Sequence, residues 1–290
     1  MEDKFYNFMI NSGLSKNTSA SYVSDIKKYK EYYYASYGED LKELIHADII
    51  TYRTYLEKHN ISYTSINRKL SALKQYNLFL ISENVQLNIA VLKKDYYKIQ
   101  PSIIAKKIPS PQEINKLKHF AIKDEKRPKR DYCMLTILIY GGLRESELVT
   151  LRLIDISLEN RTINIVGKGN KFRQIVINSV MYDAISEYLE ERNSLVTNNP
   201  YLFVGQKNIN TTKPFNRNMC NRLLSKYNAL CNITNLHPHA LRSYFCTNAL
   251  HNAGYTIDQV ANQAGHCSLN TTKAYLINTT DSLLDLANKL

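Results

Sequence analysis

The sequence predicts a mainly helical protein that carries one small antiparallel β-sheet and divides into two domains. Three observations lead to this fold class. Residues 1–95 repeat apolar side chains at the spacing of amphipathic helices. Residues 97–109 contain two prolines and no sustained period, as an interdomain linker does. Residues 162–177 alternate polar and apolar side chains around a glycine-containing turn, as a β-hairpin does.

The first domain is expected in residues 1–96. Helices are predicted at residues 18–37, 48–58 and 65–83, where apolar side chains recur every three or four residues. Cations crowd beside the apolar faces, and such faces either bind DNA phosphates or are simply solvated. The residues that we assign to DNA contact here are Lys27, Lys28, Arg68, Lys69 and Lys74.

The sequence contains 22 tyrosines and no tryptophan. Tyr32, Tyr33 and Tyr34 lie together in the first predicted helix, where rings could stack on nucleic-acid bases. Packing between helices, with some rings exposed, is the interpretation that we favour.

The second domain is expected in residues 110–290. Ser110, a proline and Glu113 form the signature of a helix start. An apolar helix at residues 130–140 ends at two glycines. Further helices are predicted at residues 180–197 and 216–231, and a capping box marks another helix start at Thr256 and Gln259.

Composition limits the environment and the partners. The net charge is +12, and the excess of Lys and Arg is larger in residues 101–290 than in residues 1–100. This indicates a polyanionic partner, and solubility alone is the lesser alternative. The longest apolar run, residues 133–143, is too short to span a bilayer, and the N-terminus lacks the layout of a signal peptide.

The cysteines are five in number and contain no CxxC pair. They predict reduced thiols, and hence a cytoplasmic protein without membrane attachment. They are Cys133, Cys220, Cys231, Cys246 and Cys267.

Six residues of the second domain have side chains suited to phosphoryl transfer. Arginines and a lysine bind phosphate, histidines transfer protons, and a tyrosine can act as nucleophile. His239 and Arg242 are three residues apart and would share a helix face. The candidates are Arg144, Lys168, His239, Arg242, His266 and Tyr275.

Simpler interpretations exist for parts of this set. Arg144 and Glu147 have the spacing of a surface ion pair. The turn at Lys168, GKGNK, lacks the pattern of a nucleotide-binding loop. His237 and His239 could begin a metal site, but no further ligands follow at suitable spacing. We therefore expect no metal and no cofactor.

Taken together, these residues resemble the catalytic pattern of the tyrosine recombinases of the Xer type, also called phage-integrase-type site-specific recombinases. That pattern is an arginine, a lysine, His-x-x-Arg, a histidine or tryptophan, and a tyrosine. The strings GLRESEL and AGHCSLNTTKAY carry the resemblance, which covers nearly the whole chain. It implies a SAM-like core-binding domain in residues 1–96 and a catalytic domain in residues 110–290.

The resemblance implies a role for each residue. Tyr275 attacks a DNA phosphate and forms a 3′-phosphotyrosyl bond, while Arg144 and Arg242 bind the non-bridging oxygens. Lys168 protonates the leaving oxygen, His239 helps remove the tyrosine proton, and His266 donates a hydrogen bond to the phosphate. Glu147 orients these cations, and we assign Lys171 and Arg173 on the hairpin to DNA contact.

The implied partner is a double-stranded recombination site bound by a tetramer. Residues 281–290 form a short apolar stripe, which would dock either on a neighbouring subunit or on its own domain. A domain that binds DNA arms is not expected before residue 1, because the helical pattern begins there. A second recombinase or an accessory protein is also compatible with the pattern.

Two other functions share these features. Type IB topoisomerases carry the same catalytic pattern and would relax DNA, and a DNA-binding protein with a decayed site would not cleave at all. All six catalytic positions are filled, and the strings match bacterial recombinases more closely than topoisomerases. Whether the recombination integrates, excises or resolves DNA, and at which sequence, does not follow from these residues.

Overall fold

The computed structural model describes residues 1–99, 108–124, 126–167, 172–205, 207, 209–234 and 236–265. By its internal contacts the chain divides into two compact units, residues 1–102 and 103–290. The predicted fold class, mainly helical with a small antiparallel sheet, is confirmed. Of the predicted linker, residues 97–109, only the two ends belong to the described part of the chain.

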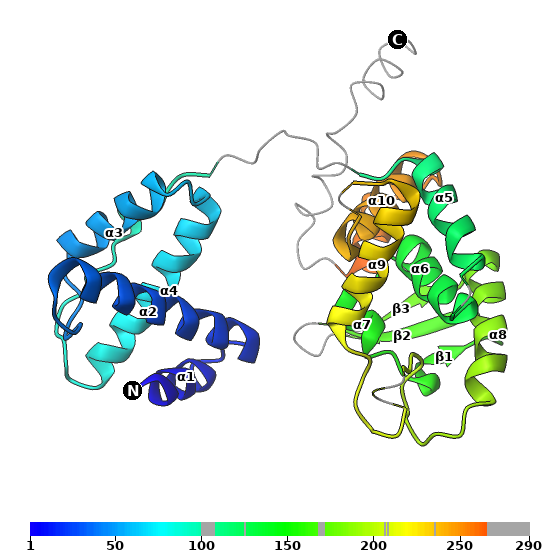
Figure 1. Ribbon diagram of the computed structural model, residues 1–290, viewed down its shortest axis with the longest axis horizontal. Coiled ribbons are helices and arrows are strands. Elements are labelled where there is room, and N and C mark those ends of the chain that lie inside the picture. Colours follow the sequence, from blue (N-terminus) through cyan, green and yellow to red (C-terminus); the bar gives the residue numbers. More distant parts are fainter. Residues whose placement is uncertain are drawn as a thin grey trace, which may run out of the picture. The chain divides into compact units, whose positions relative to one another are not determined.

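The first unit is a bundle of helices (Figure 1), and the three helices predicted from periodicity are present. Ser15 and Ser62 fix two of the helix starts, because each side chain accepts a hydrogen bond from a backbone amide three residues later. Its elements are α1 (Glu2–Asn11), α2 (Lys16–Tyr37), α3 (His46–Lys58), α4 (Tyr63–Ser82) and the 3₁₀ turn η1 (Lys93–Asp95).

Tyrosine rings fill the contact between α2 and α3. The ring of Tyr29 meets that of Tyr52 edge-on at 4.9 Å, and Tyr32 lies 4.6 Å from Tyr55. Tyr33 is buried, whereas Tyr34 faces solvent. The tyrosine cluster is therefore helix packing with some exposed rings, as predicted.

The segment after α4 is tied back to the helices by amide side chains. Asn77, within the apolar stripe of α4, donates to the Asn88 carbonyl and accepts from the Ala90 amide. Asn67 makes the same pair of bonds with the backbone of Tyr97, at 2.9 Å each. The first unit therefore includes the chain up to Tyr97.

A buried carboxylate joins α2 to α4. Asp25 is 4% exposed and pairs with both Arg68 and Lys69. The side chain of Lys69 is only 11% exposed, whereas that of Arg68 is 46% exposed. These two predicted DNA contacts thus also neutralise a buried charge, which would otherwise be costly. Lys27, Lys28 and Lys74 are exposed.

The second unit contains the sheet and the remaining helices (Figure 1). Its helix starts include the predicted capping boxes at Ser110 and Thr256, which are confirmed. Its elements are α5 (Pro111–Ile122), α6 (Pro128–Gly141), α7 (Glu145–Val149), η2 (Leu153–Asp155), β1 (Ile156–Ser157), β2 (Thr162–Val166), β3 (Phe172–Val176), α8 (Ser179–Asn193), α9 (Arg217–Cys231), α10 (Pro238–His251) and α11 (Ile257–Ala264).

The three strands are antiparallel in the order β1-β2-β3, and Ile163 pairs with Ile175. The alternation of the sequence follows this register, since the isoleucines point inward and Asn164 and Gln174 outward. Helix α6 is apolar around nearly its whole circumference because it runs through the core between α5, α8 and α10. None of the helices in the described ranges is both long and apolar enough to cross a membrane.

The backbone bonds made by Asn77 generate a prediction for stability. Replacing Asn77 by Ala leaves the amide of buried Ala90 without a partner and removes one of the two donors to the Asn88 carbonyl, which Gln86 also bonds. The cost is about 2 kcal/mol in the free energy of unfolding. The measurement is chemical unfolding of the full chain followed by circular dichroism. Asn7→Ala, an exposed change on α1, is the control and should shift stability by less than about 0.5 kcal/mol. A similarly small effect for Asn77→Ala would contradict the structural role.

Candidate active site

The turn between α6 and α7 brings the first arginine into position. Gly142 ends α6 with a φ of +63°, a conformation that other residues adopt rarely. A Cβ at this position would lie 2.3 Å from the Phe245 ring. Arg144 follows at the N-terminal end of α7. Gly142, the second of the two glycines predicted to end α6, is therefore required both by the turn and by the close approach of α10.

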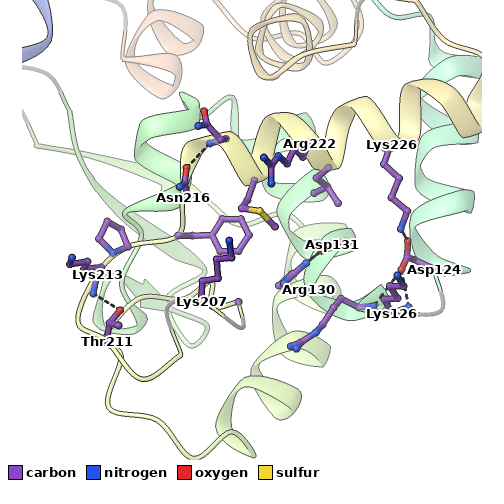
Figure 2. Close-up of a pocket in the computed structure, with 17 residues that line it drawn as sticks. Asp124, Lys126, Arg130, Asp131, Lys207, Thr211, Lys213, Asn216, Arg222 and Lys226 are labelled. Atoms are coloured by element: carbon purple, nitrogen blue, oxygen red, sulfur yellow. Dashed lines mark hydrogen bonds and ion pairs between the residues drawn. The ribbon is translucent and has the colours of Figure 1, made fainter. Parts of the chain in front are cut away.

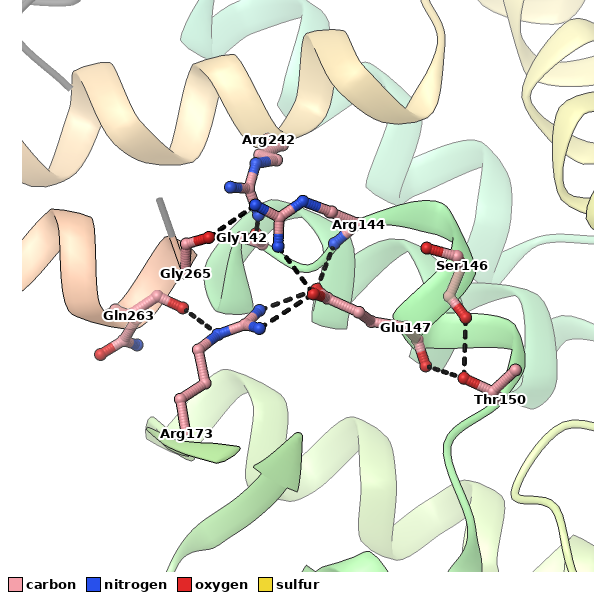
Figure 3. Close-up of polar contacts among 9 residues, drawn as sticks. All are labelled: Gly142, Arg144, Ser146, Glu147, Thr150, Arg173, Arg242, Gln263 and Gly265. Carbon is pink, nitrogen blue, oxygen red and sulfur yellow. Dashed lines mark hydrogen bonds and ion pairs between the residues drawn. The ribbon is translucent and has the colours of Figure 1, made fainter. Parts of the chain in front are cut away.

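A single buried carboxylate organises this region. Glu147 is 6% exposed and receives hydrogen bonds from the backbone and the guanidinium of Arg144, both at 2.8 Å. Arg173 of β3 donates to both oxygens of the same carboxylate, at 2.9 and 2.7 Å. Figure 3 shows the two guanidinium groups converging on Glu147. Glu147 therefore holds α7 against the sheet.

The pKa of Glu147 reflects these contacts. Burial alone would raise the pKa of its carboxyl, but the hydrogen bonds and charges of Arg173 and Arg144 more than offset burial. The net result is a pKa below the ordinary value. The carboxylate is therefore ionised at neutral pH and neutralises part of the arginine charge.

The same two arginines hold the end of α11. Arg144 Nη2 donates to the Gly265 carbonyl at 2.5 Å, and Arg173 Nε donates to the Gln263 carbonyl at 2.9 Å (Figure 3). Gly265 has a φ of +69°, and a Cβ there would lie 2.8 Å from the Arg173 guanidinium. Glycine is thus needed immediately before His266 in the sequence.

Helix α10 supplies the second arginine. His237 caps this helix, because its Nδ1 accepts a hydrogen bond from the Ala240 amide at 3.2 Å. Arg242, one turn along, is 3% exposed and donates to the Gly142 carbonyl at 2.7 Å. Burial, with the nearby charge of Arg144, lowers the pKa of Arg242 to about 10, so it remains a cation at neutral pH.

A cavity of about 280 Å³ opens between these elements. Arg144 and Arg242 both line it, and the rings of His237 and His239 lie parallel with centroids 6.3 Å apart. The arginines around the cavity outnumber the carboxylates, so the site suits an anion. The complete lining is Leu143, Arg144, Glu145, Asn221, His237, Pro238, His239 and Arg242.

A larger basic cavity, of about 1060 Å³, lies between α9, the turn before α6 and the chain around residues 205–216 (Figure 2). Four of its lining residues form ion pairs with one another: Lys226 pairs with Asp124, and Arg130 pairs with Asp131 at 2.7 Å. Its basic residues are Lys126, Arg127, Arg130, Lys207, Lys213, Arg222 and Lys226. The sequence predicted the helix at residues 216–231 but not this cavity.

The structure brings Arg144, His239 and Arg242 to one cavity, with Glu147 behind them. Lys168, Lys171, His266, Tyr275 and residues 281–290 lie outside the described residues. Nowhere in the described part of the chain are three His, Cys, Asp or Glu side chains placed so that they could hold a metal ion together.

Two roles in this region were missed from the sequence. Arg173, assigned to DNA contact, has a side chain only 11% exposed and is engaged with Glu147 and α11. Its hairpin position gave no sign of this, because Glu147 lies 26 residues away. His237 acts as a helix cap, and the proline at the next position was the available signal.

Comparisons with known proteins find matches to both units of the chain. The model of the phage integrase family matches residues 109–281, and that of its N-terminal SAM-like domain matches residues 3–84. The TnP I resolvase of Bacillus thuringiensis is 32% identical over 99% of this chain and 97% of its own length. The tyrosine recombinase XerD of Rickettsia prowazekii is 32% identical over 90% of this chain and 87% of its own.

Solved structures share the fold. A XerH site-specific recombinase bound to its difH substrate after cleavage has a TM-score of 0.74 and 22% identity, over 94% of this chain and 78% of that one. The Tn1549 transposon integrase in complex with a circular intermediate DNA has a TM-score of 0.70 and 20% identity, over 100% and 99%.

The position of Glu147 predicts a pH-dependent loss of stability. Glu147→Gln should lower the free energy of unfolding at neutral pH by about 3 kcal/mol, because two arginines lose a buried counter-charge. A lowered pKa stabilises the fold above the ordinary value of 4.5, and this stabilisation is lost as pH falls through the folded-state pKa. The difference in the free energy of unfolding between wild type and Glu147→Gln, measured by chemical unfolding, should therefore narrow as pH falls through the folded-state pKa of Glu147.

The control for this measurement is Glu159→Gln, an exposed carboxylate of the same unit. It should leave the stability nearly unchanged at every pH. A gap between wild type and Glu147→Gln that stays constant from neutral to acidic pH would count against the proposed ion pairs.

Proposed function

The chain belongs to the phage integrase family of tyrosine recombinases, and from this premise we propose that it cleaves and rejoins DNA strands at a specific site through a covalent tyrosine link. The observation that carries the proposal is the convergence of Arg144 and Arg242 on one cavity. Residues 1–96 form the core-binding domain and residues 110–290 the catalytic domain in this proposal, joined by the linker at residues 97–109.

The two arginines are suited to the charge that develops during the reaction. A phosphodiester under attack gains negative charge on its non-bridging oxygens, and fixed guanidinium donors stabilise that charge without reorganising. Arg242 is fixed by the Gly142 carbonyl, and Arg144 by Glu147 and Gly265. We assign both to the non-bridging oxygens, with Glu147 and Arg173 as the residues that position them.

The remaining roles complete the proposed reaction. The Tyr275 oxygen attacks phosphorus and becomes bonded to the 3′ phosphate, while the 5′ oxygen leaves. Lys168 gives a proton to that oxygen, His239 takes the proton of the tyrosine, and His266 donates a hydrogen bond to the phosphate. The phosphodiester energy is kept in the covalent bond, so a 5′-hydroxyl can reverse the step without ATP.

Basic surfaces of both units are assigned to the DNA backbone. In the first unit these are the exposed Lys27, Lys28, Arg68 and Lys74, with Lys69 at their edge, and in the second the basic cavity and Lys171. Contacts with phosphates release counterions, so the affinity for DNA falls steeply with salt. We further propose a tetramer on paired DNA sites in the cytoplasm, with or without a second recombinase or accessory protein.

The covalent link is tested by trapping it. The substrate is DNA that flanks the protein's own gene, nicked near the cleavage point so that the short fragment diffuses away. Wild type should form a protein–DNA adduct on a denaturing gel, and Tyr275→Phe should bind the same DNA in a salt-sensitive way without forming it. Specific binding by wild type without any adduct would favour a binding protein that does not cleave.

The same assay separates recombination from topoisomerase activity. Supplying a second duplex with a free 5′-hydroxyl should give strands joined between the two duplexes. Resealing of the original strand alone, with relaxation of supercoiled DNA, would favour the topoisomerase-like alternative.

The role of Lys168 as general acid has its own test. Lys168→Ala should keep DNA binding and slow cleavage by about 10²- to 10⁴-fold, the usual contribution of such a group. Sulfur in place of the leaving 5′ oxygen should restore the rate of the variant, because a thiolate departs without a proton. Lys116→Ala, an exposed change on α5 outside the surfaces assigned to DNA, is the control and should cleave at the wild-type rate. Cleavage of ordinary DNA at the wild-type rate would remove Lys168 from this role, as would a defect that sulfur does not correct.

A further inference from the structure

Glu145 is a carboxylate within the candidate active site for which the reaction described above has no use. It follows Arg144 directly and lines the same cavity as His239 and Arg242. Its Oε1 atom is buried and has no hydrogen-bond partner in the described part of the chain. Glu147, two residues on, is by contrast saturated with donors. A buried carboxylate oxygen without a donor is costly while it carries charge.

The groups around Glu145 come from three elements. Its own turn contributes Arg144 and Glu147, α9 contributes Arg217 and Cys220, and α10 contributes His237, His239 and Arg242. Arg144 and Arg173 already donate to Glu147, and Arg242 donates to Gly142. Leu143 adds an apolar wall to the cavity. Three of the nearby cations, Arg144, Arg173 and Arg242, thus already donate to other acceptors, whereas Arg217 acts on Glu145 through its charge.

Burial raises the pKa of the Glu145 carboxyl, and the positive charge of Arg217 offsets this only in part. With Glu145 ionised, the four arginines Arg144, Arg173, Arg217 and Arg242 exceed Glu147 and Glu145 by two positive charges. With Glu145 protonated, the excess is three. Protonation of Glu145 therefore adds one positive charge at the cavity that would receive a phosphodiester.

From this geometry we propose that Glu145 takes up a proton when DNA occupies the cavity, so that DNA binding is coupled to its protonation. The inference rests on the proposed function, because it assumes that the anion held there is a DNA phosphate. A phosphodiester adds a negative charge beside the carboxylate and removes water from it, and both effects favour the neutral acid. The proton comes from solvent, and no bond other than O–H is formed.

The sign of the resulting pH dependence follows directly. Below the pKa of Glu145 in the free protein, the carboxyl is already neutral and costs nothing on binding. Between the free and the DNA-bound pKa, binding takes up a proton, and affinity falls as pH rises by up to about tenfold per pH unit. Above the pKa of Glu145 in the DNA-bound protein the full repulsion lowers the affinity, and this group no longer makes the affinity depend on pH.

The test compares DNA affinity across pH in proteins that cannot cleave. Tyr275→Phe is the background, and the probe is a duplex that this protein selects from a random-sequence pool. Glu145→Gln mimics the neutral acid, and Glu187→Gln removes the same charge from an exposed position on α8. Affinity is measured in all three proteins from about pH 5 to about pH 8.5, on the alkaline side of the ordinary carboxyl pKa.

We expect Glu145→Gln to bind like its parent at low pH and to gain over it as pH rises, while Glu187→Gln shows no such divergence. A ratio of affinities between Glu145→Gln and its parent that stays constant over the whole range would overturn the proposal. Absence of a covalent adduct with wild-type protein would instead count against the proposed function, so the two failures are distinguishable.

A second measurement counts the bound protons directly. Calorimetric titration of DNA into the Tyr275→Phe protein, in buffers that differ in ionisation enthalpy, counts the protons taken up on binding. The number of protons taken up should be positive at pH values between the free and the DNA-bound pKa of Glu145. It should be smaller in the Glu145→Gln protein. Proton uptake that is zero at every pH, or equal in the two proteins, would refute the coupling.

Discussion

The buried carboxylate of Glu147 is the constraint on which the rest of the second unit's site depends. It joins three parts of the chain, because Arg144 reaches it from α7, Arg173 from β3, and both arginines continue to carbonyls at the end of α11. A guanidinium has five N–H donors, so the Arg144 side chain can bind Glu147 through one edge and still present N–H groups on another. The same ion pairs that hold these elements together therefore orient Arg144 for an anion.

Arg242 is fixed by a different means, burial against the carbonyl of Gly142. Gly142 contacts α10 in two ways. Its lack of a side chain leaves room for the Phe245 ring, and its carbonyl accepts a hydrogen bond from Arg242. Arg144 and Arg242 are thus held near one another although their positive charges repel. The stability of the fold offsets the free energy of this repulsion. Sites that stabilise developing charge are expected to be preorganised in this way.

Much of this arrangement was predictable from local patterns. Helix periodicity, the serine cap at Ser110 and the alternation of the hairpin depend on neighbours in the sequence, and they identified the elements correctly. What local patterns could not supply was the partner of each charge. Arg68 and Lys69 meet Asp25 of another helix, and Arg173 meets Glu147, so residues assigned to DNA by type and exposure alone were already engaged within the fold.

The central claim is that this site directs a tyrosine at a DNA phosphate, and locating the covalent bond tests it most directly. The trapped adduct can be trimmed with nuclease, digested with trypsin and analysed by mass spectrometry. The tryptic peptide of residues 274–289 contains Tyr275 as its only tyrosine. The account predicts a nucleotide remnant on that residue. A remnant on any other residue, or an intact peptide in a confirmed adduct, would contradict it.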